Sequence, residues 1–167
     1  MHPALRLGFV LVLFSSFLRA AAPAVEFVPI KGGTLRPGIR LDDFEMGEHP
    51  VTNAEYKLFV DDAKYPAPPY WTNGRIPAGL EHHPVIFVSR YNDVRAYTNW
   101  RTKKEGRVYR LPTASEFEYA ARAGRAVVKY VWGNEDPSPQ RANFSEKGER
   151  DISIWRQRLK PVKSYGA

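Results

Sequence analysis

An asparagine, the residue after it and a later aspartate form the best candidate for a metal site in this sequence. Asn143 and Phe144 are adjacent, and Asp151 follows across a polar stretch. Calcium in proteins takes roughly six to eight oxygen ligands from carboxylates, amides and backbone carbonyls. The Asn143 amide, the Phe144 carbonyl and the Asp151 carboxylate would supply part of such a set. An ordinary polar loop explains the same residues equally well, so both interpretations stay open here.

The histidines offer a second metal interpretation, a zinc site. Three of them, His49, His82 and His83, lie in the body of the chain. A zinc site needs roughly three or four converging ligands. Adjacent residues in an extended segment point to opposite sides, so His82 and His83 do not converge on one ion. We therefore expect no zinc site.

Three glutamates could be read as general acids or bases: Glu55, Glu116 and Glu118. Glu55 and Glu116 each stand three residues after a threonine, Thr52 and Thr113. This is the spacing of a capping box, in which the threonine and the glutamate satisfy each other's backbone N–H groups at the start of a helix. Glu116 and Glu118 are two positions apart and do not share a helix face. We predict structural roles for all three and no catalytic residue in the chain.

The sequence contains no cysteine. This excludes a disulfide, a thiol nucleophile and a thiolate metal ligand within these residues.

Four aromatic residues could line a sugar or peptide groove: Tyr70, Trp71, Tyr91 and Trp100. Aromatic side chains at such spacings more often belong to the core, which is the role that we predict.

Helices are predicted where the capping signals meet apolar periodicity. The first capping box predicts a helix over residues 53–63. The second predicts a helix after Thr113, and its apolar face carries Phe117, Ala120 and Ala121. A third helix is predicted over residues 92–105, with Asn92 as its N-terminal cap.

Strands and loops fill the remainder. The predicted strands cover residues 25–30, 38–46, 84–89 and 127–131. Four prolines exclude a regular helix or central strand from residues 64–83, which we predict to be a loop. Residues 135–150 are polar with little periodicity, and they form a second long loop.

The N-terminus resembles a secretory signal. Arg6 precedes an apolar run over residues 7–18, and small residues follow. We predict a signal peptide over residues 1–22 with cleavage within residues 20–24, a single domain over residues 25–167, and a secreted or periplasmic location. The apolar run is shorter than the roughly 20 residues that cross a bilayer, so no membrane attachment is expected after cleavage. An uncleaved N-terminal anchor is the alternative.

The net charge of +7 comes from basic residues that are mostly scattered along the chain. A nucleic-acid surface would need clustered basic residues with aromatic stacking or a known docking motif. Neither is present, so the charge indicates a solvated surface and no nucleic-acid partner.

Several short strings, taken in order, give the chain a resemblance to the sulfatase-modifying factor family of the formylglycine-generating enzyme type. The most specific are Pro50-Val51-Thr52-Asn53-Ala54-Glu55-Tyr56, His83-Pro84-Val85, Arg110-Leu111-Pro112-Thr113, Glu116-Phe117-Glu118-Tyr119-Ala120, Trp132-Gly133-Asn134 and Ala142-Asn143. Each string alone is weak, but the ordered set is specific. It covers most of residues 26–165.

This resemblance implies an irregular α+β fold like that of a C-type lectin domain, with long loops that calcium can pin. Family members place an Asn side chain, the next carbonyl and a later Asp around calcium. Asn143 matches that pattern by motif, and Asp151 matches by approximate spacing. The resemblance also implies an enzyme that oxidises a cysteine of an exported sulfatase to formylglycine, with molecular oxygen and copper held by two cysteines.

The family's copper-binding cysteines belong to a segment that has no match in this chain. We therefore expect the front part of a family domain, inactive as given, whose partner would be an exported sulfatase or another protein substrate. The alternative is a non-catalytic, lectin-like binding module that presents the loops 64–83 and 135–150 to a partner. The sequence does not specify an oligomeric state.

Overall fold

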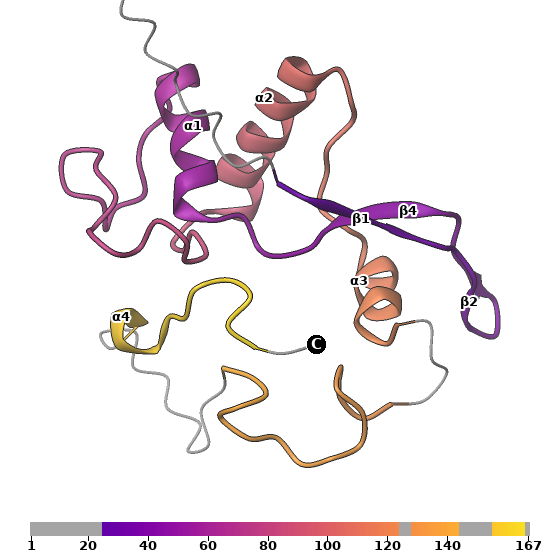
Figure 1. Ribbon diagram of the computed structural model, residues 1–167. Helices are drawn as coiled ribbons and strands as arrows, with labels where there is room; N and C mark the ends of the chain where they lie inside the picture. Colours follow the sequence, from indigo (N-terminus) through magenta and orange to yellow (C-terminus); the bar gives the residue numbers. More distant parts are fainter. Residues whose placement is uncertain (1–24, 124–127, 144–154, 166–167) are drawn as a thin grey trace, which may run out of the picture.

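The computed structural model describes residues 25–123, 128–143 and 155–165. These residues form short antiparallel strand pairs and separate helices, which confirms the predicted α+β class. The helix pair α1 (Asn53–Ala63) and α2 (Arg95–Glu105) lies at one end. A strand ribbon extends away from the pair, with α3 (Ala114–Ala121) beside it (Figure 1). No helix in the described part of the chain is long and apolar enough to cross a membrane.

The ribbon begins with an antiparallel pair, β1 (Phe27–Ile30) and β4 (Phe44–Gly47). The N–H of Glu48 donates to the carbonyl of Glu26 at 3.0 Å, which fixes the phase of the ladder. Since hydrogen-bonded and non-hydrogen-bonded pairs alternate, Val28–Met46 and Ile30–Phe44 are hydrogen-bonded pairs, whereas Phe27–Gly47 and Pro29–Glu45 are not. Pro29, which has no N–H, therefore occupies a position that needs none.

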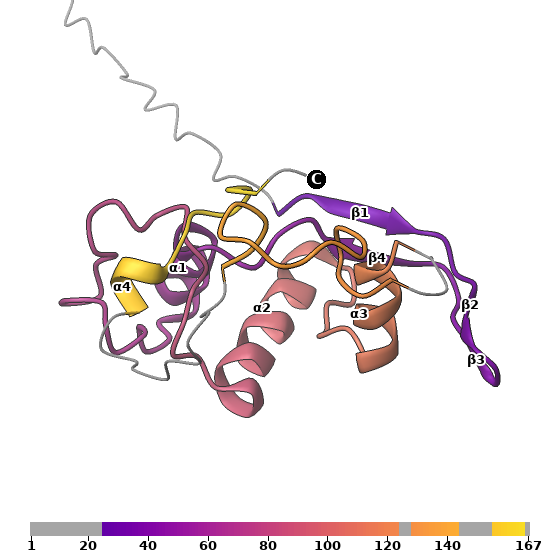
Figure 2. The ribbon, with the colours of Figure 1, turned by 90° about the horizontal axis from the view of Figure 1, so that it is seen from below.

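A second antiparallel pair, β2 (Thr34–Arg36) and β3 (Ile39–Arg40), turns at Gly38 at the far end of the ribbon (Figure 2). The strand predicted over residues 38–46 is thus two strands, β3 and β4. The break falls at residues 41–43, where Asp43 accepts hydrogen bonds from the Lys31 ammonium and the Gly32 N–H. Because this carboxylate closes the turn of the partner strand, the ladder cannot run through it.

Two further predicted strands do not form among the described residues. Residues 84–89 contribute only an isolated bridge between Pro84 and Thr52. The described part of 127–131 makes only a bridge between Tyr130 and Gly133, within one turn. Both segments contain β-branched residues that favour a strand. Neither forms one, because no neighbouring strand among the described residues pairs with it.

Helix α1 begins as its sequence predicts. The Thr52 N–H donates to Glu55 Oε2 at 2.7 Å, and the Glu55 N–H donates to Thr52 Oγ1 at 3.3 Å, which completes the capping box. The helix ends at Lys64, which adopts a left-handed conformation with φ of 53°. Its buried face carries Tyr56 and Phe59.

The third predicted helix starts differently from the expectation. A π-helical turn, η1 (Arg90–Val94), precedes α2, and its N-cap is Ser89 rather than Asn92. The Ser89 hydroxyl accepts from the Asn92 N–H at 3.1 Å, and the Asp93 carboxylate accepts from the Ser89 N–H at 2.6 Å. These two side chains satisfy the first turn, so Asn92 lies inside it. Helix α2 ends at Gly106, with φ of 68°.

Helix α3 confirms the second capping box but not its predicted apolar face. Thr113 and Glu116 exchange the two capping hydrogen bonds. The side chain that α3 buries is Glu116, whereas Phe117 is 63% exposed. The helix turns Glu116 toward Arg110 and brings the Tyr119 ring against Gly33 of the ribbon, and Phe117 points away from both.

The core lies between α1, α2 and the loop 64–83. Its buried members are Tyr56, Phe59, Val60, Trp71 and Tyr97. The rings of Tyr56 and Tyr97 stack with centroids 5.6 Å apart, and Phe59 meets Tyr97 edge-on at 5.7 Å. Such aromatic pairs stabilise a core by about 0.5–1.5 kcal/mol beyond the area that they bury.

Asn53 attaches the loop 64–83 to this core. Its side chain is fully buried, and its Oδ1 accepts from the Trp71 Nε1–H at 3.0 Å and from the Tyr70 hydroxyl. Its Nδ2 donates to the carbonyls of Leu80, at 2.8 Å, and His83, at 3.1 Å. One amide thus fixes the middle and the C-terminal end of a loop that contains four prolines.

The C-terminal segment returns to the N-terminal half of the chain. It contains the short helix α4 (Trp155–Arg158). Further on, the Val162 N–H donates to the His82 carbonyl at 2.9 Å, and the Lys163 ammonium lies 3.1 Å from Glu26 and 2.5 Å from Glu48. These contacts place residues 162–163 beside the start of the ribbon.

Candidate functional site

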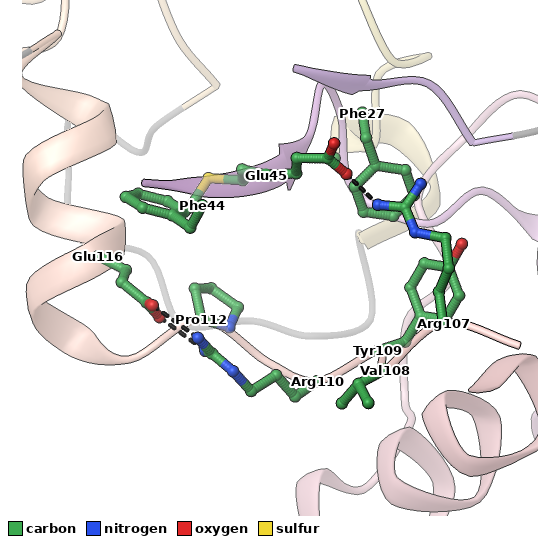
Figure 3. A pocket seen from close by; sticks show the side chains of 11 residues that line it. Phe27, Phe44, Glu45, Arg107, Val108, Tyr109, Arg110, Pro112 and Glu116 are labelled. Atoms are coloured by element: carbon green, nitrogen blue, oxygen red, sulfur yellow. Dashed lines mark hydrogen bonds and ion pairs between the residues drawn. The ribbon is translucent and has the colours of Figure 1, made fainter. Parts of the chain in front are cut away.

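A hollow of about 330 Å³ lies between β4, the segment 107–112 that joins α2 to α3, and the first turn of α3 (Figure 3). All four residues of β4 line it, but β1 contributes only Phe27. The hollow therefore runs along the edge of β4 that faces away from β1. Its size lies at the small end of the roughly 300–1,000 Å³ typical of ligand pockets.

Two ion pairs stand at opposite ends of this hollow (Figure 3). At one end the Arg110 guanidinium donates to both carboxylate oxygens of Glu116, at 2.6 and 2.7 Å. At the other end Arg107 pairs with Glu45 of β4. Each pair joins the 107–112 segment to an element on the far side of the hollow, so together they hold its walls in place.

Aromatic rings form the floor near Arg107. The rings of Phe27 and Tyr109 have centroids 5.4 Å apart. The guanidinium of Arg101, a buried residue of α2, lies 4.6 Å from the centroid of the Tyr109 ring and 5.2 Å from that of Phe27. The Arg101 side chain also donates from Nε to Glu105 at 2.8 Å. The floor near Arg107 therefore consists of the Phe27 and Tyr109 rings. The guanidinium of Arg101, whose charge is paired with Glu105, lies close to both rings.

The electrostatics of the hollow favour fixed charges over proton transfer. The Arg110 hydrogen bonds, with those of Thr113, lower the pKa of Glu116 to about 2 against the opposing effect of burial. The hydrogen bond and charge of Glu45 raise the pKa of Arg107 further above its ordinary value. Both groups stay ionised and paired at neutral pH, so neither serves as a general acid or base there.

The glutamates predicted to be structural are structural. Glu55 and Glu116 cap α1 and α3. Glu118 lies 3.1 Å from Arg36 of β2 and 2.7 Å from Arg122, so it ties α3 to the far end of the ribbon. The three carboxylates do not converge on a common point.

The histidines do not assemble a metal site. His49 Nε2 lies 4.0 Å from Glu55 Oε1, and His82 is exposed. His83 is half-buried, and its Nδ1 has no hydrogen-bond partner. Across the described residues there is no group of three or more His, Asp or Glu side chains that could hold a metal ion.

Of the calcium candidates, Asn143 alone falls within the described part of the chain. Its Nδ2 donates to the Arg158 carbonyl at 2.8 Å, which ties the loop to the end of α4. An amide in this orientation leaves the oxygen Oδ1 as the atom for a cation. Phe144 and Asp151 lie outside the described residues, as does the signal peptide predicted over residues 1–22.

The aromatic residues weighed as a groove divide between core and surface. Trp71 is buried, and Trp100 packs on Phe59 while its Nε1–H donates to Asp62 at 2.6 Å. Tyr70 packs against Trp71. Tyr91, on the π-helical turn, is 79% exposed. The core prediction therefore holds for three of these residues and is wrong for Tyr91.

Sequence reasoning missed the hollow because its residues come from distant segments. The available signal was local: Arg107 and Tyr109 are two positions apart, which puts them on one face of an extended segment. Nothing in the spacing indicated that Glu45 or Phe27 would lie opposite them.

Comparison with known proteins places this arrangement in a family. The family model described as the sulfatase-modifying factor enzyme 1-like domain matches residues 16–167. The chain belongs to this family. The match confirms the resemblance seen in the ordered strings, and it begins somewhat before the expected domain start at residue 25.

Two relatives in the sulfatase-modifying factor family are named formylglycine-generating enzyme. The one from Streptomyces coelicolor is 31% identical over 84% of this chain and 57% of its own length. The one from Bos taurus is 26% identical over 87% of this chain and 50% of its own length. This chain thus spans about half the length of the curated relatives that it matches.

A third relative carries a different name. The protein named inactive C-alpha-formylglycine-generating enzyme 2 from Bos taurus is 48% identical over 36% of this chain and 18% of its own length. The chain is thus similar both to proteins named as enzymes and to a protein named as inactive.

Proposed function

We propose that this chain is the scaffold and substrate-facing part of an exported protein of the formylglycine-generating type, and that it does not itself perform the oxidation. The observation that carries the proposal is the absence of cysteine from all 167 residues. The resemblance to formylglycine-generating enzymes implies that the oxidation belongs to two cysteines that hold copper. The residues present do not fit copper in that way, because none of them offers a thiolate ligand.

The charged side chains of the hollow support the same proposal. Arg107, Arg110, Glu45 and Glu116 are engaged with one another. They stabilise the junction between β4 and α3, which is what a scaffold requires. The partner that we propose for the whole protein is an exported sulfatase or another protein substrate.

An oxidation assay tests this proposal. The purified chain, supplied with copper and oxygen, should form no aldehyde on a Cys-x-Pro-x-Arg peptide beyond that formed without protein. The Streptomyces coelicolor relative named formylglycine-generating enzyme serves as the positive control. Turnover by the 167-residue chain would overturn the proposal.

A second candidate function is a non-catalytic binding module that presents the loops 64–83 and 135–150. Two observations favour it: the relative named as inactive, and the rigid attachment of the loop 64–83 through Asn53. The nucleotide sequence after the codon for Ala167 separates the two candidates. A continuing frame that encodes two cysteines supports the enzyme, and a continuing frame without cysteine supports the module.

Two further proposals concern location and metal. We propose that residues 1–22 direct export to a secreted or periplasmic location, which N-terminal sequencing of the exported protein tests.

We also propose that calcium binds at Asn143 with Phe144 and Asp151 as a structural ion. Asn143 is compatible with this role because its exposed amide is held by Nδ2 and leaves Oδ1 as a ligand atom.

A further inference from the structure

The two sides of the helical segment formed by η1 and α2 differ in character. One side packs on α1 and the core through Tyr97 and Trp100 (Figure 1). The opposite side carries five exposed residues, which we call the outer stripe: Arg90, Tyr91, Arg95, Asn99 and Lys103. The last four follow one another at four-residue steps, and residues four apart lie on the same side of a helix.

The π-helical turn brings Arg90 onto the outer stripe. In an α-helix, residues five apart are separated by about 140° around the axis, so Arg90 and Arg95 would face different directions. In η1 the Val94 N–H donates to the Ser89 carbonyl at 3.0 Å, five residues back, which puts more residues into the turn than an α-helix has. Residues five apart therefore come closer to the same side, and both arginines lie on the outer stripe.

The acidic side chains of η1 and α2 are engaged away from the outer stripe. Asp93 accepts from the Ser89 N–H at 2.6 Å and from the Tyr65 hydroxyl at 2.9 Å, so it joins the turn to the loop 64–83. Glu105 accepts from Arg101 Nε at 2.8 Å, beside the hollow. These are the two acidic residues between positions 90 and 105, so the outer stripe carries positive charge alone.

The cations of the outer stripe differ from their neighbours in having no acidic partner. Within the described part of the chain, Arg90, Arg95 and Lys103 form no ion pair. Lys104, the next residue, lies 3.1 Å from Asp62. The Arg90 guanidinium is held 5.9 Å from the centroid of the exposed Tyr91 ring, which leaves its charge uncompensated.

The residue types of the outer stripe indicate a macromolecular partner. Tyr and Arg are enriched among the residues that contribute most to protein–protein binding. The outside of a helix is convex, whereas small molecules bind in concave sites. Unpaired cations around an exposed ring are complementary to a surface that presents carboxylates and an apolar side chain.

We propose that the outer stripe binds an acidic segment of a partner protein. Carboxylates of that segment accept paired hydrogen bonds from the guanidinium groups of Arg90 and Arg95, and an apolar side chain covers the Tyr91 ring. A further carboxylate meets Lys103, which lies eight residues and therefore about 12 Å along the helix from Arg95. This inference does not rest on the proposed function, because it involves no oxidation.

A labelled acidic peptide tests the proposal with the 167-residue chain. Its glutamates stand at four-residue steps around a central leucine, and fluorescence anisotropy measures its binding. The peptide should bind at low ionic strength and more weakly as salt is added, since salt screens exposed charges. A matched peptide with lysine in place of each glutamate should not bind. Equal binding of both peptides, or binding of neither, would overturn the proposal.

Charge-reversal variants locate the binding surface. Arg90→Glu and Arg95→Glu should each weaken binding of the acidic peptide by roughly 10-fold, because they place like charges opposite one another. The control is Arg40→Glu on β3, which changes the same charge at another exposed arginine without an ion pair in the described structure. It should change affinity by less than about 2-fold. Equal losses in all three variants would show attraction to net charge alone and contradict the proposal.

Two more variants guard against an effect of misfolding. Arg95→Gln removes the charge without reversing it and should weaken binding by a smaller factor than Arg95→Glu. Tyr91→Ala should weaken binding by roughly 5-fold with an unchanged dependence on salt, because it removes apolar contact and no charge. Circular dichroism checks that each variant keeps the helix content of the native chain. Native affinity in folded Tyr91→Ala and Arg95→Gln variants would overturn the proposal.

Nucleic acid and anionic membrane are the other polyanions that this surface could meet. A single-stranded oligothymidylate and vesicles of phosphatidylglycerol serve as probes, at physiological ionic strength. Both should bind more weakly than the acidic peptide. Tighter binding of either probe that is lost in Arg95→Glu would reassign the outer stripe to that polyanion and overturn the proposal.

Discussion

The Glu116 carboxylate serves three donors at the start of α3. Oε2 accepts from the Thr113 N–H at 2.7 Å and from Arg110 at 2.7 Å, and Oε1 accepts from Arg110 at 2.6 Å. The sequence predicted the first of these contacts from the capping-box spacing. The contact with Arg110, six positions before Glu116, does not follow from that spacing. A capping residue thereby also becomes the anchor of the hollow.

Glu116 should make stability depend on pH at acid values. Its folded pKa of about 2 lies below the ordinary value of 4.5, so its contribution is complete above pH 4.5 and is lost as the pH falls toward 2. The difference in unfolding free energy between the native chain and Glu116→Gln should therefore shrink by about 2 to 3 kcal/mol between pH 5 and pH 2. Urea titrations at each pH measure it, and a difference that stays constant would contradict the assignment.

Asn53 is the residue on which the loop 64–83 depends. Asn53→Ala would leave the Trp71 and Tyr70 donors and the Leu80 and His83 carbonyls without their partner. We expect the unfolding free energy to fall by about 3 kcal/mol, since buried groups left unsatisfied cost roughly 1–3 kcal/mol.

The matched control for this substitution is Asn99→Ala, at an exposed position of α2. It should change stability by no more than about 0.5 kcal/mol. Limited proteolysis gives a second reading, because the loop 64–83 should become sensitive in Asn53→Ala and not in the control. Similar losses in both variants would argue against the role of Asn53.

The C-termini of α1 and α2 reach the same left-handed conformation with different residues. Lys64 adopts φ of 53° despite its side chain, and Gly106 adopts φ of 68° without a penalty. Lys64→Gly should therefore stabilise the chain by about 0.5–1 kcal/mol, because it removes the strain of a non-glycine residue.

Gly106→Ala should have the opposite effect, a loss of about 1 kcal/mol. No atom lies within 4 Å of a Cβ built at Gly106, so the loss would report backbone strain alone. Lys103→Gly, inside α2, is the control for glycine flexibility and should cost about 1 kcal/mol. Thermal unfolding of the three variants checks the pattern, which fails if both capping changes move stability in the same direction.

The helices and strands could be predicted from the sequence where a single local interaction determines where they begin. The capping boxes placed the starts of α1 and α3 correctly. The strands at residues 84–89 and 127–131 were wrong because pairing depends on a distant neighbour, which composition does not encode. The π-helical turn escaped prediction since Ser89 and Asp93 close it through contacts that helical periodicity does not reveal.

The whole molecule divides into an aromatic core and an open ribbon. Side chains bury well around α1 and α2, where Phe59 is almost inaccessible. Around β4 and α3, Val108 and Phe117 remain exposed. The α+β class and the family could be predicted from the ordered strings, but the hollow could not, because it arises only when β4 meets the 107–112 segment in three dimensions.

Calcium should act at the scale of the whole chain by joining the loop around Asn143 to α4. The Asn143 contact with the Arg158 carbonyl already brings these segments together, and an ion on Oδ1 would reinforce that junction. At calcium about ten times its dissociation constant, the unfolding free energy should rise by ~1.4 kcal/mol, seen as a higher melting temperature.

Asn143→Ala should lower the stability of the calcium-free chain through the lost hydrogen bond and should also abolish the calcium-dependent rise. Asn99→Ala should retain the rise, and magnesium at the same concentration should produce less of it, because magnesium demands stricter octahedral geometry. If millimolar calcium leaves the melting temperature unchanged, the proposed calcium site is wrong. If the rise in melting temperature persists in Asn143→Ala, calcium binds at another place in the chain.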